Sequence, residues 1–78
     1  MIFEKVRDLV ADRLNHNIED VTMEANLKED LGADSFSYAE IGMLLEDSFN
    51  VTISDLDLDQ FQTVGDLVHY LEQHVTEV

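Results

Sequence analysis

The sequence predicts an all-α fold, a small four-helix bundle of three main helices and one short helix with a long first loop. Three segments carry apolar residues at helical spacing, which is the primary signal of amphipathic helices. Only residues 51–53 alternate like a strand, and no second segment of similar pattern could pair with them. A chain of 78 residues encloses one hydrophobic core, so we expect a single domain over residues 1–78.

The first predicted helix spans about residues 2–15. Its apolar residues recur at helical spacing, and charged side chains fill the opposite face. The apolar set is Phe3, Val6, Leu9, Val10 and Leu14. One side of this helix is therefore expected to pack against the rest of the chain.

The stretch from Asn15 to Gly32 has no sustained period and is expected to form a long loop with a short helical turn. A loop of this length is uncommon in a compact domain unless its own side chains anchor it or it has a function. Val21, Leu27 and Leu31 are the apolar side chains that could anchor it.

The second predicted helix begins at Asp34-Ser35 and ends near Asn50. Ser or Asp before a periodic apolar run is a helix-start signal, and Asn is a common helix stop. The apolar positions assigned to this helix are Phe36, Ala39 and Met43, with Ile41, Leu45 and Phe49 offset from them. They are expected to form its apolar face.

The chain then passes through an extended connector at residues 51–53 into a short helix at residues 54–61. Thr63, followed three residues later by Asp66, resembles a capping box with Asp in place of Glu. The apolar face of the last helix consists of Val64, Leu67, Val68, Leu71 and Val75. This helix completes the predicted bundle.

Acidic residues dominate the composition. There are 18 Asp and Glu against 4 Lys and Arg, for a formal net charge of −14. This charge excludes nucleic acid as a partner, because binding to phosphates needs basic side chains. The chain after Lys28 has 12 carboxylates and no Lys or Arg, so partners of that part are expected to be basic.

The sequence contains no pattern typical of a catalytic or metal site. There is no Cys, and the three histidines lack the i, i+3 or i+4 spacing of a two-histidine site. Asp55, Asp57 and Asp59 resemble a calcium loop only weakly, since Gln60 stands where such a loop needs Gly. We therefore expect neither an enzyme nor a bound metal.

The N-terminal segment does not resemble a signal peptide. Glu4, Lys5, Arg7 and Asp8 lie where a signal peptide needs an uninterrupted apolar stretch. No apolar run approaches membrane-spanning length. We expect a cytoplasmic protein that does not insert into membranes.

Ser35 offers a hydroxyl after a glycine-containing turn, at the start of an amphipathic helix. A phosphate ester at this position would lie near free backbone N–H groups and the positive end of the helix dipole. Ser is also an ordinary helix N-cap, and on spacing alone a cap is the commoner reason for it.

The segment LKEDLGADS at residues 27–35 closely resembles the attachment-site region of acyl carrier proteins. Residues 40–49 look like the acidic second helix of this family, and residues 63–67 resemble the start of its last helix. The resemblance covers nearly the full chain and implies a right-handed four-helix bundle. It also implies that Ser35, preceded by Asp34, carries 4'-phosphopantetheine from coenzyme A, whose thiol holds acyl chains as thioesters.

The resemblance implies two kinds of partner, a Mg-dependent phosphopantetheinyl transferase and acyl-processing synthases and transferases. Basic patches on these enzymes are expected to dock on one face of the carrier, which is expected to be a monomer. The residues assigned to this face are Glu40, Met43, Glu46, Asp47, Asp55 and Asp57. A solvated acidic surface without a partner is the plain alternative for any single carboxylate.

Four residues depart from the family pattern. Phe36 stands where Leu usually follows the modified serine, and we expect it to bury; Ser37, Tyr38 and Gly42 are also unusual. Acyl transport in fatty acid biosynthesis is the expected function. The departures leave open a specialised carrier for a polyketide, secondary lipid or aminoacyl pathway. A different class also stays open, a small acidic helical adaptor or divalent-cation binder in which Ser35 is only a cap.

Overall fold

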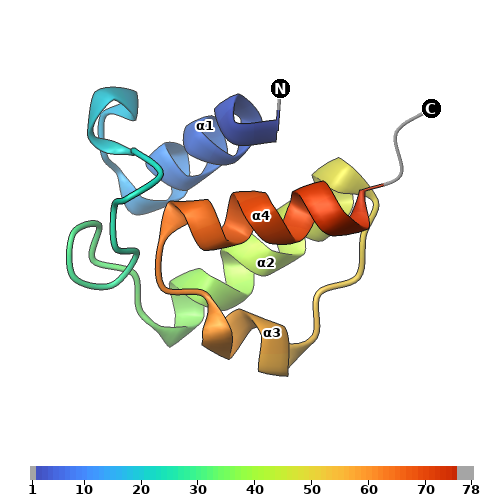
Figure 1. The fold of residues 1–78 in the computed structure, drawn as a ribbon. Helices are drawn as coiled ribbons and strands as arrows, with labels where there is room; N and C mark the ends of the chain where they lie inside the picture. Colours follow the sequence, from blue (N-terminus) through green and yellow to red (C-terminus); the bar gives the residue numbers. More distant parts are fainter. Residues whose placement is uncertain (1, 76–78) are drawn as a thin grey trace.

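The computed structural model describes residues 2–75 and contains five helical segments in that part of the chain. In order they are α1 (Ile2–Leu14), the 3₁₀ turn η1 (Ile18–Asp20), α2 (Ser35–Phe49), α3 (Asp55–Gln60) and α4 (Val64–His74). Figure 1 shows α1, α2 and α4 as the longer helices, with the short α3 against α2. The predicted all-α bundle with a long first loop is confirmed. Within the described residues, no helix is both long and apolar enough to cross a membrane.

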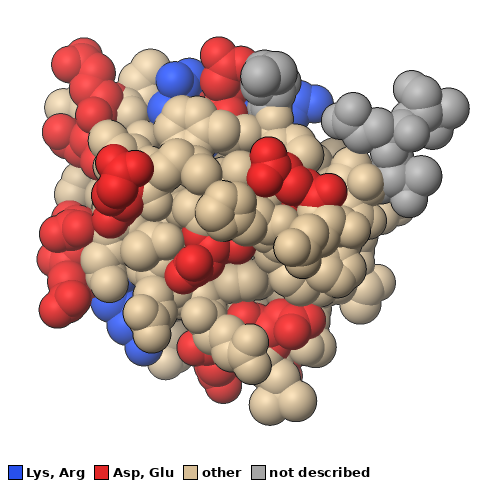
Figure 2. Space-filling view, viewed as in Figure 1, with Lys and Arg blue, Asp and Glu red and all other residues tan. Residues whose placement is uncertain are grey.

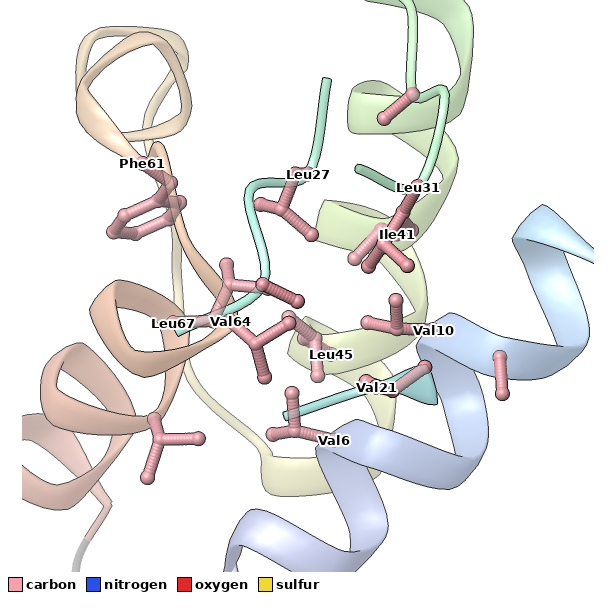
Figure 3. Close-up of a cluster of buried hydrophobic side chains, with 14 of the residues drawn as sticks. Val6, Val10, Val21, Leu27, Leu31, Ile41, Leu45, Phe61, Val64 and Leu67 are labelled. Atoms are coloured by element: carbon pink, nitrogen blue, oxygen red, sulfur yellow. The ribbon is translucent and has the colours of Figure 1, made fainter. Parts of the chain in front are cut away.

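The hydrophobic core lies between α1, α2 and α4, and Figure 3 shows side chains from all three helices in it. α1 packs against both α2 and α4. Val6 and Val10 of α1, Leu45 of α2 and Val64 of α4 have no exposed surface. The apolar faces predicted for the first and last helices therefore meet in one core, which stabilises the bundle mainly through burial.

The long loop between α1 and α2 contributes to this core. Its predicted anchors Val21, Leu27 and Leu31 are 1%, 1% and 3% exposed. The backbone N–H of Leu27 donates to the carbonyl of Gln62 over 2.8 Å, which ties the loop to the segment before α4. Buried side chains and backbone hydrogen bonds together explain how so long a loop keeps one conformation.

The predicted helix stop and capping box are both present. Asn50 follows α2 with φ 56° in the left-handed region, and its N–H donates to the carbonyl of Glu46. At the start of α4, the N–H of Asp66 donates to Thr63 Oγ1 over 3.2 Å. The N–H of Thr63 donates to Asp66 Oδ2 over 3.1 Å, which completes the reciprocal pair.

Asp66 is also expected to make stability depend on pH. Its carboxylate accepts hydrogen bonds from the N–H groups of Gln62 and Thr63, and these bonds hold its pKa below the usual range. The unfolded chain therefore takes up this proton first as the pH falls. The stabilisation from ionised Asp66 is complete above the unfolded pKa of about 3.9 and is lost as the pH falls through the lower folded pKa.

Asp66→Asn is expected to lower the free energy of unfolding by about 1 kcal/mol at pH 7, because a neutral amide oxygen accepts the two N–H bonds more weakly than a carboxylate does. The difference from wild type should shrink at an acidic pH below the lowered pKa of Asp66, where both side chains are neutral. Urea unfolding at the two pH values measures it. Glu72→Gln, at an exposed carboxylate on the same helix, is the matched control. An equal loss of unfolding free energy at both pH values would show that ionised Asp66 does not stabilise the fold.

The predicted apolar face of α2 is only partly correct. Ile41 and Leu45 are buried, whereas Phe36 is 71% exposed and Met43 is 68% exposed. Successive residues turn by about 100° around a helix, so Phe36 and Met43 share one side, roughly 140° from Ile41. The core covers only the side that carries Ile41 and Leu45. The prediction that Phe36 buries was therefore wrong.

Candidate functional site

Ser35 is the first residue of α2, and its side chain is exposed. A turn precedes it in which Gly32 has φ +76°, a conformation that favours glycine. Leu31 and Ala33, on either side of this glycine, are buried. The N–H of Ala33 donates to the carbonyl of Leu27 over 2.8 Å. The core therefore fixes the turn and leaves the serine at the surface.

The N-cap of α2 is Asp34. Its backbone is extended, with φ −116° and ψ −175°, and its Oδ1 accepts a hydrogen bond from the N–H of Ser37 over 2.8 Å. Hydrogen bonds from Ser37 hold the pKa of the Asp34 carboxyl below its usual range. The interpretation of Ser35 as the helix cap is therefore wrong. Asp34 is the N-cap, and Ser35 is the first helical residue of α2.

A shallow hollow of about 160 Å³ lies beside Ser35, between α2 and α3. Its lining residues are Lys28, Ser35, Tyr38, Ala39, Asp55, Leu58 and Asp59. Both polar and apolar groups thus face a space that a chain attached to Ser35 could reach. Among these residues, Ser35 is the predicted attachment site and Asp55 is a predicted docking residue.

Tyr38 fixes one wall of the hollow. Its hydroxyl donates to the carbonyl of Phe61 over 2.8 Å, and its ring packs against the core. Burial raises the pKa of this hydroxyl, and the charge of Asp66 raises it further. The side chain is therefore neutral and held in place at physiological pH. The one signal for this role in the sequence was that Tyr38 departs from the family pattern.

The carboxylates predicted for partner docking differ in their surroundings. Glu40 forms an ion pair with Arg13 over 3.1 Å. Glu46 accepts a hydrogen bond from the N–H of Ile53 over 2.8 Å. Asp57 accepts one from the Tyr70 hydroxyl over 3.1 Å. These three carboxylates thus contribute to the fold itself.

The other three predicted docking residues lie at the surface. Met43 is 68% exposed, and Asp47 and Asp55 are also exposed. Figure 2 shows acidic side chains spread across one face of the molecule, with basic side chains only near its margins. Such a surface attracts basic partners at long range.

Asp55, Asp57 and Asp59 belong to a helix rather than to a calcium loop. Residues Asp55–Gln60 form α3, with the Ser54 hydroxyl accepting the N–H of Asp57 at its start. Within residues 2–75, no group of three or more His, Cys, Asp or Glu side chains could hold a metal ion. Two of the histidines make local contacts: a ring nitrogen of His16 lies 3.0 Å from the Leu31 carbonyl oxygen. A ring nitrogen of His74 lies 2.8 Å from the carbonyl oxygen of Tyr70.

Gly42 allows α3 to approach α2 closely. A Cβ atom at this position would lie 2.9 Å from Leu58 Cδ2 and 3.2 Å from Leu58 Cδ1. The glycine that departs from the family pattern thus has a packing reason, because Leu58 lies directly over it. Leu58 also lines the hollow beside Ser35.

Gly42→Ala is expected to displace Leu58 and shift α3 while the bundle stays folded. Alanine favours the helix by about 1 kcal/mol over glycine, which offsets the cost of moving one flexible side chain. Amide resonances of α3 should change in a two-dimensional NMR spectrum, and the free energy of unfolding should stay within about 1 kcal/mol of wild type. Ser48→Ala, at an exposed position of α2, is the control. Unaltered α3 resonances would show that the position of the Leu58 side chain does not depend on Gly42.

The site suits a group attached through a phosphodiester. The Ser35 side chain is exposed, does not cap the helix and has an open hollow beside it. It also lies in the first turn of α2, where the helix dipole favours negative charge. Ser35 would hold the group, and the residues of the hollow would contact its first atoms.

Two comparisons with known proteins agree with this geometry. The family described as "Phosphopantetheine attachment site" matches residues 4–71. The acyl carrier protein of Clostridium acetobutylicum is 39% identical over 77 residues, which is 99% of this chain and 100% of that protein. The chain belongs to the acyl carrier protein family. This carrier is also 41% identical over 73 residues to the acyl carrier protein of Clostridium perfringens, over 94% of this chain and 96% of that protein.

Solved structures match the fold of the carrier. A protein assigned as an acyl carrier protein from Mycobacterium tuberculosis has a TM-score of 0.87 at 27% identity, over 94% of this chain and 97% of that chain. The apo doublet acyl carrier protein from prodigiosin biosynthesis has a TM-score of 0.82 at 24% identity. That second match covers 97% of this chain and 37% of the other, and it shows a likeness of fold alone.

Family membership confirms the resemblance found in the sequence. The carrier bears acyl groups on a covalently attached 4'-phosphopantetheine group and is not an enzyme. Proteins of this family interact with phosphopantetheinyl transferases and with acyl-processing enzymes.

Proposed function

We propose that this carrier holds acyl chains as thioesters on a phosphopantetheine arm attached to Ser35, as a single carrier domain in fatty acid biosynthesis. The observation that carries the attachment site is the exposed Ser35 at the start of α2, with Asp34 acting as the cap in its place. In the attachment step, Ser35 Oγ bonds to the pantetheine-bearing phosphorus of coenzyme A. The adenosine bisphosphate leaves, and the transferase takes up the serine proton.

The clostridial relatives support the role of an acyl carrier, and fatty acid biosynthesis is the pathway expected from the resemblance in the sequence. Both clostridial proteins have the plain name acyl carrier protein and match over nearly their whole length. The specialised-carrier alternative draws support from Phe36, a large apolar side chain that is 71% exposed directly after Ser35. A partner enzyme that approaches Ser35 must accommodate this ring.

The adaptor alternative depended on Ser35 acting only as a helix cap. Asp34 has that role, so the alternative loses its basis in the sequence. The cytoplasmic location and the monomeric state expected from the sequence stay predictions.

Intact mass spectrometry tests the attachment. The protein is incubated with coenzyme A, Mg²⁺ and a broad-specificity phosphopantetheinyl transferase, and fragmentation locates the modified residue. A gain of one phosphopantetheine on Ser35 is the expected result. No gain, with a transferase active on another carrier, would contradict the proposal. Acyl groups released from the carrier isolated from its own cells would then distinguish fatty acyl cargo from polyketide or aminoacyl cargo.

Asp47 is expected to help dock the transferase and synthases. Reversing its charge with Asp47→Lys should slow loading several-fold at low salt, since acidic surface groups mainly raise association rates. The effect should fade at high salt, where screening shortens the range of the field. Asp47 is preferable to Glu40 because Glu40 also pairs with Arg13 within the fold.

Glu72→Lys makes the same change of charge at an exposed position of α4 and serves as the matched control for Asp47→Lys. Its loading rate should fall less than that of Asp47→Lys. Equal rates for both variants would mean that net charge alone governs docking and would count against a specific acidic face.

A further inference from the structure

Lys28 is the only Lys or Arg between residues 14 and 78. It nevertheless lines the same hollow as Ser35, in the strongly acidic part of the chain. A phosphodiester attached to Ser35 would add another negative charge there, close to the carboxylates of Asp34, Asp55 and Asp59. Lys28 is the one basic side chain that lines this hollow, so it is the only lining residue that could neutralise this charge.

The backbone of Lys28 is held on both sides. Its N–H donates to Asn26 Oδ1 over 3.0 Å, and the same oxygen accepts the N–H of Glu29 over 2.9 Å. Its carbonyl accepts the N–H of Gly32 over 3.1 Å. The side chain therefore starts from a fixed point in the turn that leads to Ser35.

The charged end of Lys28 is directed by an aromatic ring. Its Nζ lies 5.6 Å from the centroid of the Tyr38 ring, within the range of a cation–π interaction. Tyr38 is itself fixed by its hydrogen bond to the Phe61 carbonyl. The Lys28 ammonium group therefore lies over a fixed aromatic ring at the edge of the hollow.

The positive charge of Lys28 is not neutralised by an ion pair within residues 2–75. Asp55 and Asp59 line the same hollow, yet the two ion pairs in the described part of the chain are Arg7–Asp8 and Arg13–Glu40. An ammonium group that is placed, accessible and without a carboxylate within 4.0 Å is available for an anionic ligand. Lysine commonly binds phosphate in this way, as a point charge.

We infer that Lys28, held over Tyr38, binds the phosphodiester of the arm attached to Ser35 and directs the start of that arm into the hollow between α2 and α3. This inference rests on the proposed attachment to Ser35. The Tyr38 ring then forms the wall against which the pantoyl methyl groups pack. The arm of the carrier at rest lies along the protein instead of extending freely into solvent.

NMR of the loaded carrier tests this inference after intact mass has verified loading. Nuclear Overhauser cross-peaks are expected between the arm methyl protons and the Tyr38 ring protons. Lys28→Gln should lose these cross-peaks and shift the ³¹P resonance, while Lys28→Arg should keep them. In wild type, 1 M NaCl should weaken them, because the Debye length falls to about 3 Å.

Lys5→Gln is the matched control for Lys28→Gln. Lys5 also lies over an aromatic ring, with its Nζ 5.9 Å from the Phe49 centroid, and the change of charge is the same. Neither Lys5 nor Phe49 lines the hollow beside Ser35. This variant should keep the cross-peaks of wild type.

Two results would overturn the inference and can be told apart from failure of the proposed function. Loaded wild type without the cross-peaks, or cross-peaks that survive both Lys28→Gln and high salt, would show that Lys28 does not place the arm. A wild type that gains no mass, or gains it at a residue other than Ser35, would instead overturn the attachment site and this inference with it.

Discussion

Ser35→Ala is expected to abolish the gain of phosphopantetheine mass while the protein stays folded. The change removes the oxygen that would form the phosphodiester, so no residual loading is expected at that position. Ser35 is exposed and does not cap α2, so the free energy of unfolding should change by no more than about 0.5 kcal/mol. Intact mass after incubation with coenzyme A, Mg²⁺ and a transferase measures the first effect, and urea unfolding measures the second.

Ser37→Ala is the sharpest control for Ser35→Ala. Ser37 lies two residues further along α2, which places it about 200° away around the helix. This variant should load as wild type does. Loading that persists in Ser35→Ala, or disappears in Ser37→Ala, would place the attachment on a different hydroxyl.

Leu45→Ala is expected to bring the bundle close to unfolding. Leu45 has no exposed surface and lies in the core between α1, α2 and α4. Truncating a buried leucine costs about 2–5 kcal/mol. A domain of this size has a total stability of about 4–12 kcal/mol, by the usual range per residue. The midpoint of urea unfolding should therefore fall sharply.

Leu56→Ala makes the same chemical change at a leucine that is 75% exposed. Its unfolding midpoint should stay near that of wild type, because exposed positions usually contribute within about 0.5 kcal/mol. A similar fall of the unfolding midpoint in both variants would mean that burial of Leu45 does not stabilise the core. The slope of the unfolding curve should be unchanged in Leu56→Ala, which keeps the comparison within two-state behaviour.

Local chemistry made much of the fold predictable. The apolar period of the last helix and its capping box depend on residues three or four positions apart, such as Thr63 and Asp66. The stop at Asn50 depends on the tolerance of one residue for the left-handed region. The anchors of the long loop were also predictable, because isolated apolar residues in a polar stretch have few other reasons to be there.

The candidate site was predictable only in part. Asp34 and Ser35 are both good helix caps, and the sequence pattern could not separate them. The backbone dihedral angles decide it, since Asp34 is extended and Ser35 is already helical. The hollow beside Ser35 was beyond prediction from the pattern, because α3 forms one of its walls and comes from a distant part of the chain.

By itself, the sequence determined the helices, their caps, the acidic surface and the serine at the start of α2, because each depends on neighbouring residues or on composition. Only the tertiary structure decided that Phe36 and Met43 face outward, since α2 has two apolar sides and the packing of α1 covers one of them. It also brought Lys28, Tyr38 and Leu58 to one hollow. Such a meeting depends on how the long loop and α3 pack against α2, which no local pattern encodes.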